Sequence, residues 1–287
     1  MNLRFENVSF AYENFNSPTS NQLDSINFAI RPGEVVGIVG RSGSGKTTLM
    51  QLCNGLLMPE QGRIVVDEQD INLTDYALTA LRRRLGLVFQ FPETQLFAAT
   101  VEEEIAFGPQ QQNLGAIEFQ ECVTNSLQLV GLNASFTGRN PFTLSQGEKR
   151  RVAIASVLAM QPEMLVLDEP TAGLDARGVA EISTILKDWL APERTLMIIS
   201  HDVDFIATLC SRVLVLEKGR LLYDGTASSL WGNEATPLGW EILRKAALPV
   251  PRYQRLQQQL SQQGIEWNAK PTVADFSFAM HAEKFHF

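Results

Sequence analysis

The stretch EVVGIVGRSGSGKTTLMQLCNGL, residues 34–56, decides the fold. It opens with a short continuous apolar run, EVVGIVG (34–40), which is typical of a strand buried on both faces of a parallel sheet. The next segment, GRSGSGKT (40–47), fits the phosphate-binding pattern G-x-x-x-x-G-K-S/T, and the sequence after it can form a helix. A glycine-rich turn could arise by chance, but this order of strand, loop and helix predicts a nucleoside triphosphate site.

The residue types of this loop match what a triphosphate needs. Gly43 and Gly45 allow backbone N–H groups to close on the phosphates, and Lys46 reaches the β and γ oxygens. Thr47 carries a hydroxyl that can ligate magnesium. The nucleotide-binding candidates in this loop are Gly40, Arg41, Ser42, Gly43, Ser44, Gly45, Lys46, Thr47 and Thr48.

Two carboxylates follow a second apolar run, in MLVLDEP (164–170). Asp168 ends the expected strand, where it can hold Mg²⁺ directly or through a water molecule, and Glu169 can accept a proton from an attacking water. The alternative is that the pair only caps the next helix. Together with the phosphate-binding loop upstream, the pair predicts hydrolysis rather than phosphoryl transfer to a metabolite, because it positions a water.

Two further polar residues end expected strands. His201 follows TLMIIS (195–200), so it should lie on the sheet edge that carries the nucleotide and contact the γ-phosphate. A lone histidine is otherwise more often an ordinary surface or core residue. Gln90 ends LGLVFQ (85–90) and offers an oxygen to magnesium or an amide to the water. The catalytic candidates are therefore Glu169, His201 and Gln90, and the candidate Mg²⁺ ligands are Thr47, Gln90 and Asp168.

The remaining patterns predict an α/β fold built on a mixed sheet core. Alternating apolar residues in 3–12 and 62–71 indicate antiparallel pieces, and 212–225 is typical of a hairpin. From about residue 91 to 160 the apolar residues shift to helical spacing, which predicts a helical insert in the α/β core.

We expect a main domain over residues 1–228 and a C-terminal extension over 229–287. Pro249 and Pro251 interrupt the extension, after which apolar residues recur at helical spacing among glutamines up to Gly264. This pattern predicts a small amphipathic helix. The helix could pack on the main domain, or it could mediate self-association or docking of a partner.

Composition limits the classes of function. The chain has 287 residues and a formal net charge of −8, which argues against a nucleic-acid binder with a broad basic surface. Three cysteines without C-x-x-C spacing indicate reduced thiols rather than zinc or disulfides. No signal-peptide pattern is visible, and no apolar run approaches the roughly 20 residues that cross a bilayer. Any work at a membrane therefore requires docking on an embedded partner.

Taken in order, these motifs resemble those of the ATP-binding cassette (ABC) ATPases, over about residues 3 to 240. Tyr12 matches the aromatic that stacks on adenine, with Phe10 as the alternative. AGLD, which ends at Asp175, matches the family's D-loop, and LSQGE (144–148) matches its signature. The resemblance implies that the chain uses ATP and Mg²⁺. It also implies that two ATPases, identical or homologous, pair head to tail, and that Ser145 and Gly147 of one contact the ATP of the other.

The signature departs from the usual family sequence, L-S-G-G-Q. Gln146 replaces a glycine, and Glu148 replaces the glutamine with a charge that would repel a phosphate. An acidic residue in the first turn of a helix is favoured by the helix dipole. We therefore expect Glu148 to face away from the nucleotide and the signature to function.

A narrower resemblance follows Gln90. FPETQLFAATVEEEIAFGP (91–109) is similar to the ATPases of energy-coupling factor (ECF) importers. This implies two ATPases on the cytoplasmic face of the membrane, under a transmembrane coupling protein and a substrate-binding membrane subunit for a vitamin or transition-metal ion. Gln95, Phe97 and the glutamates 102–104 would lie near the docking cleft. The glutamates could equally form a solvated helix start.

Two other classes of function compete with transport. A soluble ABC ATPase of DNA repair or translation usually adds a coiled-coil or zinc insertion, or a second cassette, and the sequence has none of these patterns. A regulatory subunit with little catalysis is disfavoured by the presence of Glu169 and His201. The sequence leaves open both the transported substrate and the choice between a homodimer and a heterodimer.

Overall fold

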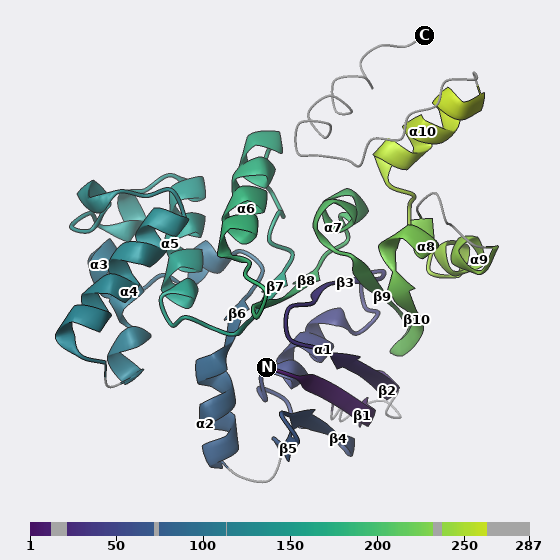
Figure 1. Ribbon diagram of the computed structural model, residues 1–287, viewed down its shortest axis with the longest axis horizontal. Helices are drawn as coiled ribbons and strands as arrows, with labels where there is room; N and C mark the ends of the chain where they lie inside the picture. The colour runs from purple at the N-terminus through teal and green to yellow at the C-terminus, as the bar shows by residue number, and fades with distance from the viewer. Residues whose placement is uncertain (13–21, 72–74, 113, 232–236, 263–287) are drawn as a thin grey trace.

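A six-stranded sheet runs through the middle of the molecule (Figure 1). The computed structural model describes residues 1–12, 22–71, 75–112, 114–231 and 237–262. In spatial order the strands of this sheet are β10 (Arg220–Thr226), β9 (Arg212–Glu217), β3 (Val35–Val39), β8 (Thr195–Ile199), β7 (Met164–Asp168) and β6 (Leu85–Val88). All neighbours pair in parallel except β10 with β9. The predicted α/β fold with buried parallel strands is therefore confirmed.

A second, antiparallel sheet packs against the first. Its spatial order is β2 (Leu23–Ile30), β1 (Leu3–Phe10), β4 (Gln61–Val66) and β5 (Gln69–Asp70). The stretch 62–71 is thus two short strands. Its turn has positive φ angles at Asp67 (45°) and Glu68 (68°), which is the backbone of a tight type I′ hairpin. The same geometry occurs at Lys218 (50°) and Gly219 (77°) between β9 and β10, where the sequence predicts a hairpin.

The central sheet buries side chains on both faces, because successive residues of a strand point to opposite sides. On β7, Met164 and Val166 join the core shared with the antiparallel sheet and with helix α1 (Lys46–Cys53). Leu165 and Leu167 join the core on the other face. That second core also includes residues of α5 (Gln146–Leu158), α6 (Ala176–Trp189) and α7 (Val203–Leu209). This double burial explains the continuous apolar runs.

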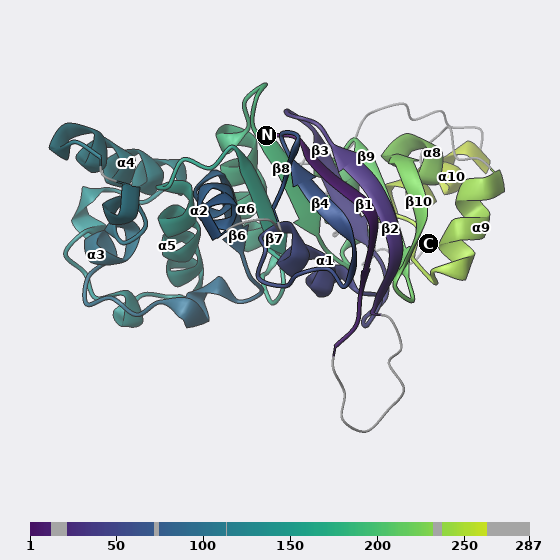
Figure 2. The same ribbon diagram turned by 90° about the horizontal axis from the view of Figure 1, so that it is seen from below.

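Helices gather at both ends of the molecule, as Figures 1 and 2 show. At one end lie α3 (Val101–Ala106), α4 (Ala116–Leu129) and α5, which follow α2 (Asp75–Arg84) and β6 in the chain. Four 3-10 turns connect them, namely η1 (Pro92–Gln95), η2 (Pro109–Gln112), η3 (Ala134–Phe136) and η4 (Pro141–Thr143). The stretch 91–160 is therefore mainly helical. Its status as a separate subdomain stays a prediction.

Three helices form the described part of the C-terminal region, namely α8 (Ala227–Trp231), α9 (Pro237–Lys245) and α10 (Arg252–Gln262). Leu230 and Trp231 of α8 and Ile242 of α9 belong to the core of the main sheet. Helix α8 spans the predicted boundary between 1–228 and 229–287, which remains a prediction. Gly264, the expected end of the last helix, lies outside the described residues. None of the described helices has the length and apolar character needed to cross a membrane.

Candidate nucleotide-binding and hydrolysis site

The loop between β3 and α1 has the backbone of a phosphate cradle. Gly43 and Gly45 have φ angles of +78° and +104°, a region that favours glycine. A Cβ atom at Gly45 would come within 2.6 Å of Leu23 Cδ2, whereas one at Gly43 would meet open space. Helix α1 begins at Lys46 without a side-chain cap, so its first N–H groups are available to an anion. The buried Ser44 hydroxyl also lacks a hydrogen-bond partner. The loop therefore fits a polyphosphate.

Three polar side chains meet where α1 begins and β7 ends. Lys46 Nζ donates to the backbone oxygens of Gly40 at 2.8 Å and of Arg41 at 3.0 Å. Thr47 Oγ1 donates to Asp168 Oδ2 at 3.2 Å. Burial raises the pKa of Asp168 above its ordinary value, although the bond from Thr47 opposes this shift. A hydroxyl beside a carboxylate is an oxygen donor set that suits Mg²⁺.

Glu169 is held by the end of the neighbouring strand, β8. Its backbone has a left-handed φ of 49°, and its N–H donates to the Ile199 carbonyl oxygen at 2.8 Å. Ser200 Oγ donates to Glu169 Oε2 at 2.9 Å, and the His201 backbone N–H donates to Oε1 at 2.9 Å. His201 Nδ1 lies 2.8 Å from the same Oε1. The carboxylate is thus fixed from two sides.

Ser200 is a residue that sequence reasoning missed. Its hydroxyl accepts from the backbone N–H of Asp202 at 3.0 Å and donates to Glu169, so it acts both as acceptor and as donor. The side chain is fully buried. The signal that could have revealed it is the position of a hydroxyl residue at the end of a buried strand, immediately before the histidine.

These elements enclose one cleft of about 310 Å³. It is lined by Gln22, Ser42, Gly43, Gly45, Lys46, Thr47, Thr48, Gln90, Asp168, Glu169 and His201. The structure therefore brings together the predicted loop, both carboxylates, the histidine and Gln90. Gln22 is an additional lining residue that the motifs did not indicate.

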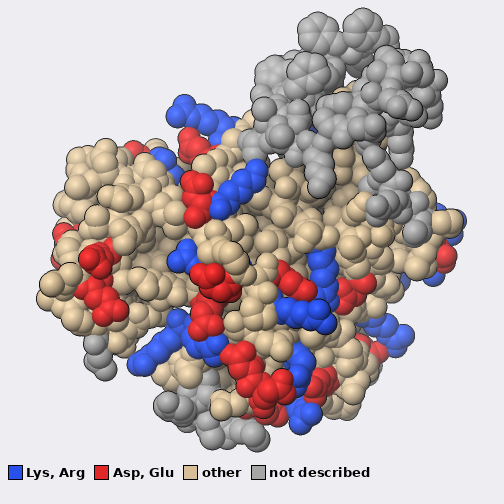
Figure 3. All heavy atoms as spheres, in the orientation of Figure 1, with Lys and Arg blue, Asp and Glu red and all other residues tan. Residues whose placement is uncertain are grey.

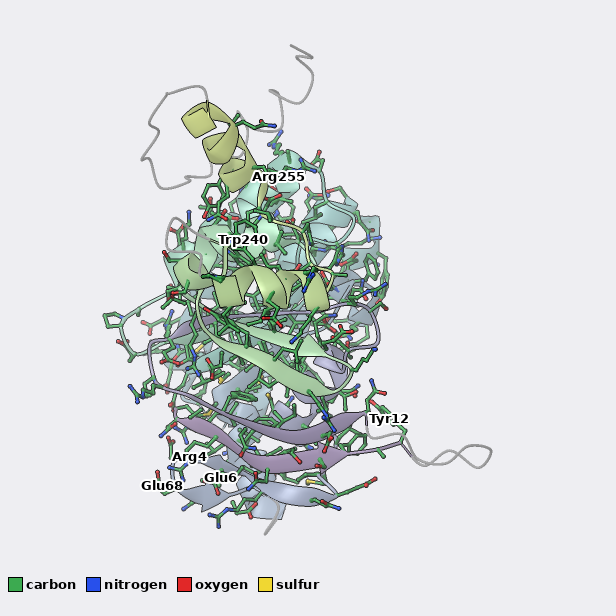
Figure 4. The ribbon with its side chains drawn as sticks, turned by 90° about the vertical axis from the view of Figure 1, so that its right-hand side faces the viewer. Arg4, Glu6, Tyr12, Glu68, Trp240 and Arg255 are labelled. Carbon is green, nitrogen blue, oxygen red and sulfur yellow. The ribbon has the colours of Figure 1, made fainter. Side chains whose placement is uncertain are left out.

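Tyr12 and Phe10 differ in how far they are available to a nucleotide base. Tyr12 is 44% exposed, whereas Phe10 is buried and touches it edge to face. The Tyr12 hydroxyl lies 3.2 Å from Thr48 Oγ1 and donates to Gln51 Oε1 at 3.3 Å. Figure 4 shows Tyr12 at the opposite end of β1 from Arg4. Of the two candidates, Tyr12 is the one with a ring free to stack.

The signature residues do not line this cleft. Ser145 is the exposed N-cap of α5, and a Cβ atom at Gly147 would meet open space. Asp175 caps α6 by accepting from the Gly178 N–H at 2.8 Å. These three positions lie outside the cleft that contains Lys46.

Glu148 binds the start of its own helix. Its Oε2 accepts from Ser145 N at 2.8 Å and from Ser145 Oγ at 2.7 Å, and its expected orientation away from the nucleotide stays a prediction. These bonds belong to a capping box, in which the first and fourth residues of the helix start satisfy each other's free donors. The bonds from Ser145 hold the pKa of Glu148 below its ordinary value.

The sequence comparison decides the family. The family described as ABC transporter matches residues 23–172, more than half of the chain.

The chain belongs to the ABC transporter family.

Relatives agree with this membership over nearly the full length. An energy-coupling factor transporter ATP-binding protein, EcfA2, from Clostridium tetani is 40% identical over 268 residues, which cover 92% of this chain and 91% of the relative. A solved structure titled cbiO1 from Clostridium perfringens, part of the ABC transporter complex cbiONQ, is 36% identical. It has a TM-score of 0.73 and covers 89% of this chain and 98% of its own. The ATP-binding cassette MJ0796, solved as a dimer bound to ADP and Pi, is 28% identical, with a TM-score of 0.70 over 78% of this chain and 98% of its own.

A second cleft, of about 210 Å³, lies on the helical side of this ABC fold, between β6, η1, α3 and α5. Phe97 and Phe107, which both line it, are 60% and 51% exposed and touch edge to face. We call this cleft the docking groove. Two of the nearby glutamates have structural roles. Glu104 Oε2 accepts from the N–H groups of Phe97 at 2.9 Å and Ala98 at 2.8 Å, and Glu103 completes a capping box with Thr100.

Proposed function

We propose that the chain is the ATP-hydrolysing subunit that powers an ECF-type importer for a vitamin or a transition-metal ion. The ABC family supports ATP binding, and the names of relatives that match almost the whole chain support the ECF type. The observation that carries the proposal is the cleft in which Glu169, His201 and Lys46 meet. A soluble role in DNA repair or translation has no comparable support.

The residues of the cleft have distinct chemical tasks. The N–H groups of residues 42–47 and Lys46 bind the phosphates of ATP. Thr47, Asp168 and Gln90 would hold Mg²⁺, which when bound neutralises charge on the phosphate oxygens. Glu169 accepts the proton of the attacking water. Hydrogen bonds from Ser200 and the His201 N–H hold its carboxylate at the cleft, in position for this role.

His201 has an electrostatic role in this proposal. It contacts the γ-phosphate and, with Lys46, stabilises the negative charge that develops there. The 73% exposure of its side chain leaves the ring accessible from the cleft.

A second ABC ATPase, identical or homologous, completes the site in this proposal. Ser145 and Gly147 are exposed and lie outside the cleft of their own chain, which favours a role toward the ATP of a neighbour. The dimeric structure of MJ0796, to which the chain is similar, supports pairing. Binding of ATP would close the pair and hydrolysis would open it, because the two states differ by contacts to one phosphate.

The docking groove is our candidate for the contact with a transmembrane coupling protein, which also joins a substrate-binding membrane subunit. Its exposed Phe97 and Phe107 offer apolar surface of the kind that marks protein interfaces. The chain would then lie on the cytoplasmic face of the membrane as a peripheral subunit. Figure 3 shows acidic and basic side chains interspersed over one face of the molecule, an arrangement that gives no support to nucleic-acid binding there.

Co-purification from membranes tests this function. The tagged chain should be recovered from detergent-solubilised membranes together with small hydrophobic proteins, and uptake in cells should stop with Lys46→Ala although the complex still forms. Phe97→Asp should abolish the co-purification, whereas Phe142→Asp, at an exposed aromatic outside the groove, should preserve it. Recovery of the wild-type chain without any membrane protein would contradict the proposal.

A further inference from the structure

The unusual residue of the signature makes a long-range contact. Gln146 stands where the family usually has glycine, and its Nε2 donates to Glu93 Oε1 at 2.6 Å. Glu93 comes three residues after Gln90 in the chain and belongs to η1. A glycine at position 146 has no side chain and could not make this bond. The departure from the usual signature therefore adds a link between the signature and η1.

Glu93 is at the same time half of a buried ion pair. Its Oε2 accepts from Arg150 Nε at 3.0 Å, and its Oε1 accepts from Arg150 Nη2 at 3.0 Å. The two side chains are only 2% and 3% exposed. A bidentate pair of this kind fixes direction as well as distance. Glu93 thus binds Gln146, the first residue of α5, and Arg150, in the second turn of α5.

Arg150 extends the link to the segment that follows Glu169. Its Nη1 donates to the backbone oxygens of Ala172 at 2.8 Å and of Pro170 at 3.3 Å. One buried carboxylate, on Glu93, therefore connects η1, the start of α5 and the segment after Glu169. We call Glu93, Gln146 and Arg150 the latch.

The latch lies between residues that line the docking groove and Ser145. Pro92 and Gln95, which flank Glu93 in η1, line the groove. Gln146 directly follows Ser145, the N-cap of α5. A displacement of η1 by a protein in the groove would therefore move Glu93, and through Gln146 and Arg150 it would move the start of α5. The packing of buried groups transmits such shifts because the interior is dense.

We propose that Gln146 is a positioning residue that ties Ser145 to η1, so that a membrane partner in the docking groove sets the position of the signature. This inference rests on the proposed function, since it needs a second nucleotide site for Ser145 to reach and a partner in the groove. Gln146 itself binds Glu93 and takes no part in the chemistry.

Substitutions at Gln146 test the latch in the complex purified with its membrane partners. Gln146→Glu sets two carboxylates against each other, and Gln146→Gly removes the bond. Gln146→Met keeps a side chain of similar length but lacks the N–H donor. Lys149→Gln, on the same turn of α5, changes the net charge by the same amount as Gln146→Glu and serves as the control.

We expect Gln146→Glu to lower the maximal hydrolysis rate of the complex about ten-fold, equivalent to about 1.4 kcal/mol in the barrier, and Gln146→Gly to lower it about three-fold. The affinity of the isolated chain for ATP should stay unchanged, because Gln146 lies outside the cleft of its own chain. Gln146→Met should lower the rate about three-fold, as Gln146→Gly does, because it also lacks the donor to Glu93. Lys149→Gln should match wild type.

The outcomes separate this inference from the proposed function. A wild-type complex that does not hydrolyse ATP would refute the proposed function itself. An active wild-type complex whose Gln146→Glu and Gln146→Gly variants match it would overturn the latch. A Gln146→Met variant as fast as wild type would also overturn it, because the donor to Glu93 would then be dispensable. Equal melting temperatures of the Gln146 single variants and wild type would show that their rate losses are not losses of folding.

Discussion

Ser200 Oγ donates to Glu169 Oε2 at 2.9 Å, so a hydroxyl group at the end of the neighbouring strand orients the proposed general base. The same hydroxyl accepts from the Asp202 N–H at 3.0 Å, which fixes the direction in which its own hydrogen points. Glu169 also receives the His201 N–H on its other oxygen. A carboxylate with this support is oriented before substrate arrives, which reduces the reorganisation needed during reaction.

Removal of the Ser200 hydroxyl should slow hydrolysis without weakening ATP binding. Hydrogen bonds to charged groups contribute about 1.5–3 kcal/mol, so Ser200→Ala should lower kcat about ten-fold or more. KM for ATP should not change, since Ser200 does not line the cleft. Ser200→Thr keeps the hydroxyl and should recover most of the rate. Steady-state kinetics distinguish this role from simple destabilisation, and a Thr variant as slow as Ala would contradict it.

The ionised Asp168 carboxylate should lower the free energy of unfolding at neutral pH. Burial raises its pKa in the folded protein, so the folded state binds this proton more tightly than the unfolded chain does. The ionised form therefore disfavours folding above the raised pKa, and the cost disappears as the pH falls toward the ordinary carboxyl value of about 3.9. Asp168→Asn should raise the melting temperature of the nucleotide-free protein at about pH 7, and this gain should shrink at about pH 4, near the ordinary carboxyl value, while hydrolysis is lost.

The pH dependence supplies the control for Asp168. The stabilising effect of Asp168→Asn should be smaller at the lower pH, because the wild-type carboxyl is then closer to being protonated. A gain in melting temperature that is equal at both pH values would show that the substitution acts through packing or hydrogen bonding instead of through charge.

Tyr12 should bind the base through its ring and be oriented by its hydroxyl. Stacking of a base on an aromatic side chain is worth about 1–3 kcal/mol, so Tyr12→Ala should weaken ATP binding about ten-fold or more. Tyr12→Phe keeps the ring and loses only the contacts with Thr48 and Gln51, so it should weaken binding about three-fold or less. Titration with ATP of the purified chain measures both. Equal affinities of the Ala and wild-type proteins would exclude stacking by Tyr12.

The capping box of Glu148 should stabilise α5. We expect the charge of Glu148 to have little effect on the function of the signature. Glu148→Ala removes one half of the capping box and should lower the free energy of unfolding by about 1 kcal/mol. Glu148→Gln keeps an acceptor for the Ser145 N–H and should lie near wild type in urea denaturation. Its hydrolysis rate should change by no more than about three-fold. A Gln variant faster by orders of magnitude would mean that the carboxylate blocks Ser145.

Sequence reasoning succeeded where function depends on the ends of buried strands. Asp168 and His201 each follow an apolar run, and parallel strands bring such ends to one edge of a sheet, so their convergence on the loop around Lys46 was predictable. The narrow resemblance after Gln90 pointed to the region where the structure has a cleft, and the docking of a partner there stays a prediction. The position of Tyr12 next to the Thr48 hydroxyl agrees with the choice of Tyr12 over Phe10.

Other features depend on contacts that no local pattern encodes. Glu93 and Arg150 are charged residues 57 positions apart, and only the packed structure reveals that they are buried against each other. The capping box between Glu148 and Ser145 was not predicted, because we considered repulsion from phosphate and not the free donors at the helix start. The division of 62–71 into two strands was missed because Glu68, unlike Asp67, is not a usual turn residue for a positive φ angle.

The most direct test of the account is the fate of ATP on the Glu169→Gln variant of the complex. Glu169→Gln keeps the shape of the side chain and removes the proton acceptor, while leaving Lys46 and Thr47 in place to bind nucleotide. After incubation with labelled ATP and Mg²⁺ and rapid gel filtration, the variant should retain ATP, not ADP, and its turnover should fall by at least about a hundred-fold relative to wild type. Turnover equal to that of wild type would contradict the account.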